Sequence, residues 1–359
     1  MTSLTHTPAA AAAHRAGTPR AIAVWLLVCA AMVFAMAVIG AVTRLTESGL
    51  SMVEWRPLIG ILPPLSEAEW QRVFELYKQF PEYRLRNAGM TIEQFRGIFF
   101  WEWFHRLWGQ LIGFVFLLPF LWFWLTRRIP KGLMPRLAGL FVLGGFQGLV
   151  GWFMVLSGLV DRPSVSHYRL AMHLSMAFLI YVLLLRVALD LLDPASGGHR
   201  AAPAGSLRRH ARAASAAVAV TVVWGAFTAG LDAGLVYPTW PLMGGRLVPA
   251  EAWDLAPTWS NLFENHATVQ FAHRWLAAAA ALAVLALGWR AWSAQGMTAR
   301  GRALGVALGL AALGQVTLGI GTLHSGVAVG IAAAHQAGAL VVISLLAWFL
   351  HEIRRPQAA

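Results

Sequence analysis

The chain has little charge and almost no cysteine for its length. Only 12% of its 359 residues are Asp, Glu, Lys or Arg, whereas soluble globular proteins average about 25%. Its single cysteine, Cys29, excludes an intramolecular disulfide and any metal or iron–sulfur site built from several cysteines. These shortages argue against a soluble protein and against a small disulfide-stabilised one.

The chain is instead rich in apolar residues. They make up 58% of the chain, and several apolar runs reach about 20 residues, the length that crosses a bilayer core. The class is therefore a polytopic helical membrane protein. The expected spans are residues 21–43, 103–125, 134–157, 167–189, 213–231, 267–290, 301–322 and 327–350.

The net charge of +12 reflects membrane topology. The basic residues cluster in three short loops, 127–136, 193–212 and 290–302, which alternate with loops of balanced charge. Loops rich in Lys and Arg stay in the cytoplasm, so both termini are expected there as well. This pattern predicts membrane lipid as the surroundings and no nucleic-acid partner.

The sequence repeats itself at matched spacings. "GAVTRLTESGL" at 40–50 aligns without gaps with "GAFTAGLDAGL" at 225–235. Further pairs follow at nearly constant offsets: His105-Arg106 with His273-Arg274, Gln147 with Gln315, and His173 with His335. Each repeat holds four spans, so both have the same orientation, which predicts a parallel repeat about an axis along the membrane normal.

The expected architecture is an all-α membrane protein of eight helices in two four-helix halves. Residues 44–102 form a long outer loop with an amphipathic helix near 66–78, capped by Ser66. The expected divisions are a cytoplasmic tail at 1–20, the first half at 21–192, a cytoplasmic linker at 193–211, the second half at 212–352 and a second tail at 353–359.

Four histidines recur at matching positions inside the spans: His105, His173, His273 and His335. A single intramembrane histidine is most often a hydrogen-bonded core residue, but four at repeat positions favour a shared chemical role. Two histidines at the same depth in a four-helix bundle can both bind the iron of one haem. Their positions in the spans predict that these sites lie near the outer face of the membrane. Zinc or copper is less suitable because each requires further ligands.

Glu102 is the sharpest difference between the halves. It precedes His105 by three residues and so shares its helix face, whereas Gln270 occupies the equivalent place in the second half. Two readings are open. Glu102 orients His105 or pairs with Arg106, or it is an acid/base group beside a bound substrate.

Arginines near the outer face are candidates for pairing with haem propionates, since these carboxylates require cations in a low-dielectric site. Anchoring to lipid headgroups explains each of them equally well. The candidates are Arg106, Arg274, Arg44, Arg56, Arg84 and Arg86.

Several segments together resemble one family. They are "TRLTESGLSMVEWRPLIGILPP", "FPEYRLRNAGM", "EQFRGIFFWEWFHRLWGQLIG", "NLFENHATVQFAHR" and "AAAHQAGAL". The resemblance is to haem A synthase, in the class of mitochondria and many proteobacteria, and it covers about residues 22–352. The other class of that family carries cysteine pairs in its outer loops, which this chain lacks.

The resemblance implies an oxidoreductase that oxidises the C8 methyl group of haem O to a formyl group, giving haem A for cytochrome c oxidase. It implies that His105, His173 and Glu102 hold substrate haem O. His273 and His335 would hold a haem B cofactor that passes electrons. The expected location is a bacterial inner membrane. Expected partners are haem O synthase, the oxidase assembly machinery, an electron donor and further copies of the chain.

Other functions fit the same ligands. A two-haem membrane cytochrome that only moves electrons would leave its haem side chains unchanged. A haem-delivery factor would bind haem O and release it unaltered. A transporter would place its polar groups at the bilayer midplane, whereas here they cluster toward the outer face.

Overall fold

The computed structural model describes residues 8–54, 61–158, 164–193 and 205–354, with the backbone alone described for 8–17. Eight of its helices are long and apolar enough to cross a membrane, as expected, which indicates a multi-pass membrane protein. They are α1 (Pro8–Leu45), α4 (Ile92–Leu125), α5 (Met134–Leu156), α6 (His167–Leu192), α7 (Gly205–Gly230), α9 (His266–Ser293), α10 (Ala299–His324) and α11 (Val329–Glu352).

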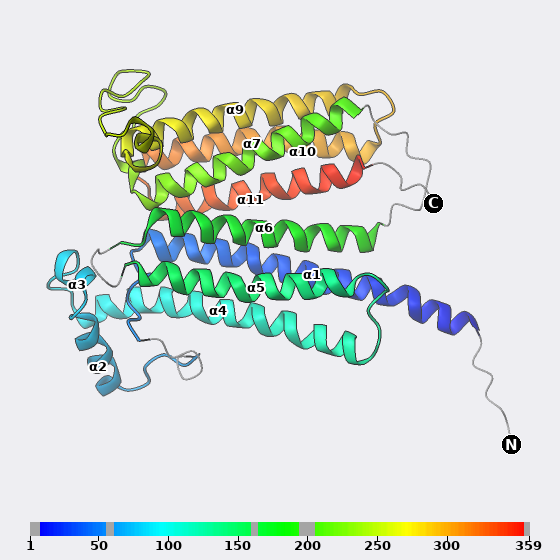
Figure 1. Cartoon of the computed structure of the whole chain (residues 1–359), viewed down its shortest axis with the longest axis horizontal. Helices are drawn as coiled ribbons and strands as arrows, with labels where there is room; N and C mark the ends of the chain where they lie inside the picture. Colours follow the sequence, from blue (N-terminus) through cyan, green and yellow to red (C-terminus); the bar gives the residue numbers. More distant parts are fainter. Residues whose placement is uncertain (1–7, 55–60, 159–163, 194–204, 355–359) are drawn as a thin grey trace.

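Short elements gather in the connections at one end of these helices (Figure 1). We call this the loop end; α1 begins and α11 ends at the opposite, terminal end. The short elements are α2 (Glu67–Tyr77), α3 (Pro81–Leu85), η2 (Ala233–Leu235), η3 (Thr258–Ser260) and α8 (Asn261–Glu264). Within the described ranges the chain forms no strand, only an isolated bridge between Met243 and Arg246.

The long helices pack in two groups, each around its own apolar core. The first core takes nearly all its buried residues from α1, α4, α5 and α6, and the second takes its buried residues from α7, α9, α10 and α11 and their adjoining ends. The groups meet where α6 lies against α7 and where α1 and α6 lie against α11. Two hydrogen bonds cross this junction inside the bundle, from Gln336 Nε2 to the Ala37 carbonyl and between the Tyr181 and Ser344 hydroxyls.

Most of the predicted spans agree with the helices, but three helices start well before their apolar runs. Helix α4 begins at Ile92, whereas a span was expected to begin at 103. Thr91 and Gln94 form a capping box that starts the helix before the apolar run. The predicted amphipathic helix is confirmed as α2, whose N-cap Ser66 accepts a hydrogen bond from the Glu69 amide. Helices α1 and α7 also start earlier than their apolar runs, at Pro8 and Gly205.

The early start of α4 gives α2 a surface to pack on. Phe74 and Tyr77 of α2 form a buried cluster with Phe95 and Phe99 in the first turns of α4. The connection between α1 and α4 is therefore anchored to the same helix that carries Glu102 and His105.

Glu82, at the start of α3, makes this packing sensitive to pH. Its side chain is buried and accepts a hydrogen bond from the Tyr77 hydroxyl at 3.0 Å. Burial, aided by the negative charges of Glu102 and Glu47, raises the pKa of Glu82 from 4.5 to about 8. Between these two pKa values, Glu82 is protonated in the folded loop and ionised in the unfolded loop.

We expect the stability that Glu82 contributes to be complete below about pH 4.5 and to fall as pH rises through about 8. The loss is at most about 1.4 kcal/mol per pH unit. Hydrogen exchange of residues 67–85 between pH 6 and pH 9 measures it. Glu82→Gln should abolish the pH dependence, and an unchanged profile in that variant would contradict this account.

Candidate functional site

Each of the four predicted histidines lies against a glycine of a neighbouring helix. A Cβ atom built on Gly151 of α5 would lie 2.9 Å from Cε1 of His173 on α6. A Cβ on Gly319 of α10 would lie at the same distance from His335 on α11. The rings therefore occupy space that any larger residue at these glycines would fill.

The other two histidines are seated in the same way. Gly225 of α7 faces His273 of α9, where an added Cβ would approach Cε1 to 2.9 Å. Gly40 of α1 faces His105 of α4, and the added Cβ would lie 3.1 Å from Nε2. Gly40 and Gly225 are matching residues of the repeated sequence.

The histidines come together as two pairs within the described part of the chain. His105 interacts electrostatically with His173, and His273 interacts with His335. All four residues are only partly buried as a whole. His173, His273 and His335 lie about two turns from the loop-end start of their helices. His105 lies farther along α4 because that helix starts early.

The ring Nδ1 atoms of the second pair are buried. Among the described residues, neither the Nδ1 of His273 nor that of His335 has a hydrogen-bond partner. Buried polar groups are normally paired, so an unpaired ring nitrogen is expected where a bound group completes the site. Neutral imidazoles of this kind are common metal ligands.

Glu102 is buried, with its two carboxylate oxygens in different contacts. Oε2 accepts hydrogen bonds from the Ser51 hydroxyl at 2.8 Å and from the Met52 amide at 2.6 Å. Oε1 pairs with the guanidinium of Arg106, one turn further along α4. The carboxylate thus ties the connection after α1 to α4.

The second half uses an amide and an arginine to hold the equivalent connection. Gln270 is also buried, and its Nε2 donates to the carbonyls of Gly234 and Tyr237. Arg274 donates to the carbonyls of Thr239 and Tyr237 at 2.7 and 2.6 Å. The two halves therefore differ in charge at this point while sharing an anchoring role.

Three of the arginines expected near haem propionates, Arg106, Arg44 and Arg274, donate hydrogen bonds to the protein itself. Arg106 donates to the Met52 carbonyl at 3.0 Å as well as to Glu102. Arg44 pairs with Asp232 at 2.8 Å, a contact between the two helix groups. Arg274 keeps one buried Nε without a hydrogen bond among the described residues. Arg56 lies outside the described residues.

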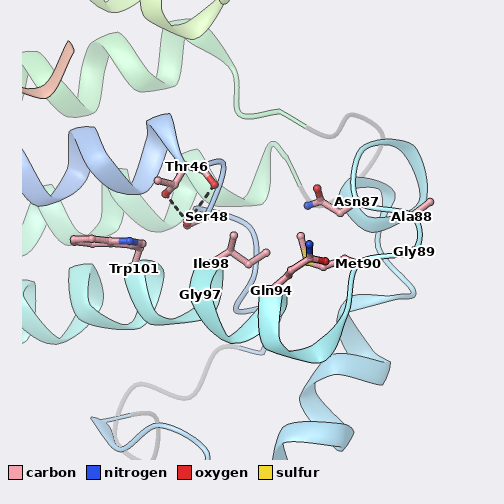
Figure 2. A pocket seen from close by; sticks show the side chains of 10 residues that line it. All are labelled: Thr46, Ser48, Asn87, Ala88, Gly89, Met90, Gln94, Gly97, Ile98 and Trp101. Atoms are coloured by element: carbon pink, nitrogen blue, oxygen red, sulfur yellow. Dashed lines mark hydrogen bonds between the residues drawn. The ribbon is translucent and has the colours of Figure 1, made fainter. Parts of the chain in front are cut away.

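A pocket of about 590 Å³ opens at the loop end beside α4 (Figure 2). The described residues that line it carry no carboxylate, imidazole or basic group: Thr46, Ser48, Asn87, Ala88, Gly89, Met90, Gln94, Gly97, Ile98 and Trp101. Trp101 precedes His105 by one turn on the same helix face. The pocket therefore lies about one helical turn from His105 along α4, and its described lining residues offer no acid/base group.

Among the described residues, no three His, Cys, Asp or Glu side chains cluster in a way that could hold a bare metal ion. Pairs of imidazoles are suited instead to a metal whose other ligands come from a macrocycle. Two sets of contacts were not expected from the sequence: Ser51 and Met52 with Glu102, and Gly40 and Gly225 with the histidines. The repeated segment containing both glycines was the available signal.

Comparisons with known proteins find similar sequences over nearly the whole chain. The family model described as "Cytochrome oxidase assembly protein" matches residues 23–347. A protein named "Heme A synthase" from Rhodospirillum centenum is 61% identical over 359 residues, covering 99% of this chain and 95% of its own. Proteins of the same name from Paramagnetospirillum magneticum and Parvibaculum lavamentivorans are 51% and 47% identical, covering 94% and 93% of this chain and 95% of each of their own.

Proposed function

Since this chain belongs to the haem A synthase family, we propose that it oxidises the C8 methyl group of haem O to a formyl group, giving haem A. The observation that supports this most strongly is the arrangement of the histidines. His105 is brought together with His173, and His273 with His335, each against a helix glycine. Two such pairs provide one site for a substrate haem and one for a resident haem.

We assign substrate haem O to His105 and His173, and haem B to His273 and His335. The residues of the second pair fit a permanent cofactor. Their Nδ1 atoms are buried without a hydrogen-bond partner among the described residues, and the neutral side chain of Gln270 takes the place that Glu102 has in the first half. Haem B held there would serve as an electron carrier for the first site. The first pair lies on the side of the molecule that has Glu102 and the loop-end pocket.

Glu102 is the proposed proton acceptor of the substrate site. Oxidising a methyl group releases protons as well as electrons, and a site away from water needs a base to receive the protons. The Ser51 and Met52 hydrogen bonds hold one oxygen of Glu102 in place, while Arg106 compensates its charge. Gln270 cannot take a proton, which suits a site that only transfers electrons.

The arginines have a second role in this proposal. Arg106 and Arg274 orient the connections after α1 and α7 through backbone carbonyls. The remaining buried Nε of Arg274 is a donor suited to a haem propionate. Arg44 and Arg56 stay predictions as propionate partners.

The same proposal includes the membrane arrangement. We take residues 21–192 and 212–352 as two parallel repeats. The chain would lie in a bacterial inner membrane with both termini in the cytoplasm. The histidine pairs would then lie nearer the outer face of that membrane. The four histidines lie against glycines at matching positions of the two halves, which supports the repeat. Haem O synthase and the oxidase assembly machinery are the expected partners, together with an electron donor.

A chemical comparison separates this function from its alternatives. Membranes that make the protein, and so keep its redox partners, are supplied with haem O, and the haems are extracted with acid–acetone and identified by mass. The proposal requires haem A to accumulate at the expense of haem O. An electron-transferring cytochrome or a delivery factor would leave the mass of haem O unchanged, and that result would refute the proposed activity.

The close contacts between the histidine rings and the helix glycines give a prediction that does not depend on enzyme turnover. In Gly319→Ala the new methyl group would lie 2.9 Å from Cε1 of His335 and displace the ring. Overpacking of this kind costs about 1–3 kcal/mol, so we expect haem binding at the second pair to weaken about tenfold or more. Gly314→Ala is the matched control, because a Cβ on Gly314 meets nothing within 4 Å. Haem titration measures both, and equal affinities would contradict the assignment of His335.

A further inference from the structure

The two halves differ in how closely their second and third helices pack. In the second half, α9 and α10 approach backbone to backbone: a Cβ atom added to Gly288 would lie 2.5 Å from the carbonyl oxygen of Gly305. A Cβ added to Gly305 would lie 2.7 Å from Cβ of Ala291. Such close approach depends on small residues in both helices, and it leaves no room for a ligand to pass between them.

The first half has large side chains at the matching positions of α4 and α5. Phe120 takes the place of Gly288, and Leu137 takes the place of Gly305, at the offset that also relates the histidines. Phe120 contacts α5 through its ring, which is stacked on the ring of Phe141 with 6.2 Å between the centroids. Helices that touch through rings lie farther apart than helices whose backbones touch.

One face of α5 is exposed where the matching face of α10 is covered. Phe141, Gly144 and Gly148 share this face at helical spacing, and all three are exposed. At the matching positions of α10, Ala312 is buried and neither of the other two residues is exposed. A Cβ added to Gly144 or Gly148 would meet no described atom within 4 Å. The boundary between α4 and α5 is therefore less closed than the boundary between α9 and α10.

Helix α4 also differs from α9 near this boundary. Pro119 is partly exposed, whereas the matching Leu287 of α9 is fully buried. A proline inside a helix removes the hydrogen bond to the carbonyl four residues earlier. That carbonyl, of Val115, instead accepts a hydrogen bond from Trp25 Nε1 at 2.8 Å. This part of α4 is thus bonded to α1, while its contact with α5 depends on aromatic rings.

The exposed face of α5 leads to the first histidine pair. Gly151 follows Gly144 and Gly148 on the same side of the helix, and the ring of His173 lies against Gly151. His105 is carried by α4, on the other side of the boundary. A ligand that passes between α4 and α5 would therefore arrive between the two imidazoles.

We propose that substrate haem O enters and leaves the first histidine pair from the membrane, between α4 and α5, whereas the contact of α9 with α10 closes the matching path to the second pair. The inference rests on the proposed function and deepens it, because a substrate must exchange and a cofactor must stay. A haem is a large and mostly apolar ring, so it partitions into lipid in preference to water.

Uptake of haem O by the full-length protein tests this path. The protein, carrying haem B, is placed in lipid vesicles that contain haem O. It is recovered at intervals, and its haems are extracted and identified by mass, counting haem O together with any haem A formed from it. Gly144→Trp fills the boundary and should slow uptake about tenfold, which corresponds to about 1.4 kcal/mol of added barrier, without lowering the final amount bound.

Gly139→Trp is the matched control. Gly139 is also exposed and a Cβ there meets no described atom within 4 Å, but it lies on the opposite side of α5, so uptake should keep its native rate. Native-rate uptake by Gly144→Trp, or equal slowing by Gly139→Trp, would overturn the inference. If the native protein took up no haem O at all, the proposed function would fail instead.

A cross-link gives a second measurement that does not depend on filling space. In a chain with Cys29→Ala, the pair Phe116→Cys and Phe141→Cys replaces two stacked rings of α4 and α5, and a short bismaleimide can join the two thiols. Joining them should stop the uptake of haem O, which the same variant shows before cross-linking. The matching pair in α9 and α10, Val284→Cys and Gly309→Cys, should leave uptake unchanged when joined. Undiminished uptake with α4 and α5 joined would show that haem O takes another path.

Discussion

The Glu102→Gln variant is expected to form haem A about 10²–10⁴-fold more slowly than the native protein, the usual loss for one acid/base group. The amide is nearly the same size but cannot accept a proton. It also presents NH₂ to a site where the hydroxyl of Ser51, the amide of Met52 and the guanidinium of Arg106 all donate. Haem extraction measures the rate, and accumulation of a partly oxidised haem would identify the blocked step.

A matched variant separates proton transfer from anchoring of the loop. Ser51→Ala removes one of the hydrogen bonds to Glu102 and leaves the carboxylate in place. We expect it to retain most of the activity while loosening the connection after α1, as reported by hydrogen exchange of residues 46–54. Near-native haem A formation by Glu102→Gln, or an equal loss in Ser51→Ala, would reduce Glu102 to a structural anchor.

The His273→Ala and His335→Ala variants should each lose haem B and, with it, the formation of haem A. Each change removes one of the two imidazoles that would hold haem B, and the first site would then lack its electron carrier. The first pair should still bind haem, since His105 and His173 lie on other helices. Haem quantification and the reduced-minus-oxidised spectrum measure the loss.

His324→Ala is the control for these variants because His324 is exposed at the end of α10. It should keep both haems and most of the activity. The ligand assignment would be wrong if His273→Ala and His335→Ala both retained their haem content and their reduced spectrum.

The eight helices were predictable because each bilayer-spanning segment carries its own signal in about 20 consecutive residues. The span predicted at 134–157 is α5 to within one residue. The start of α4 was missed since Ile92–Trp101 is amphipathic and outside the apolar run, and its boundary depends on the capping box of Thr91 and Gln94. Apolarity predicts the span of such a helix, and local hydrogen bonding determines its ends.

Only those parts of the candidate site that recur in both halves of the sequence were predictable. The matched spacing of His105, His173, His273 and His335 along the chain was enough to indicate the two pairs. The partners of Glu102 were not predictable, because Ser51 and Met52 lie about 50 positions away and reach it through the conformation of a loop. Likewise, Gln147 and Gln315 match in sequence, yet among the described residues only Gln147 lies within hydrogen-bond distance of the ring of its histidine.

The division of labour between the two histidine pairs is tested most directly by the masses of the bound haems over time. Membranes making the full-length protein are given a pulse of haem O, the protein is purified at intervals, and its haems are extracted and weighed. The native protein should hold one haem whose mass stays that of haem B and another whose mass changes from haem O to haem A. His173→Ala should keep the first and lack the second. A native protein in which the bound haem O never changes mass, or a His173→Ala variant that still converts it, would contradict the account.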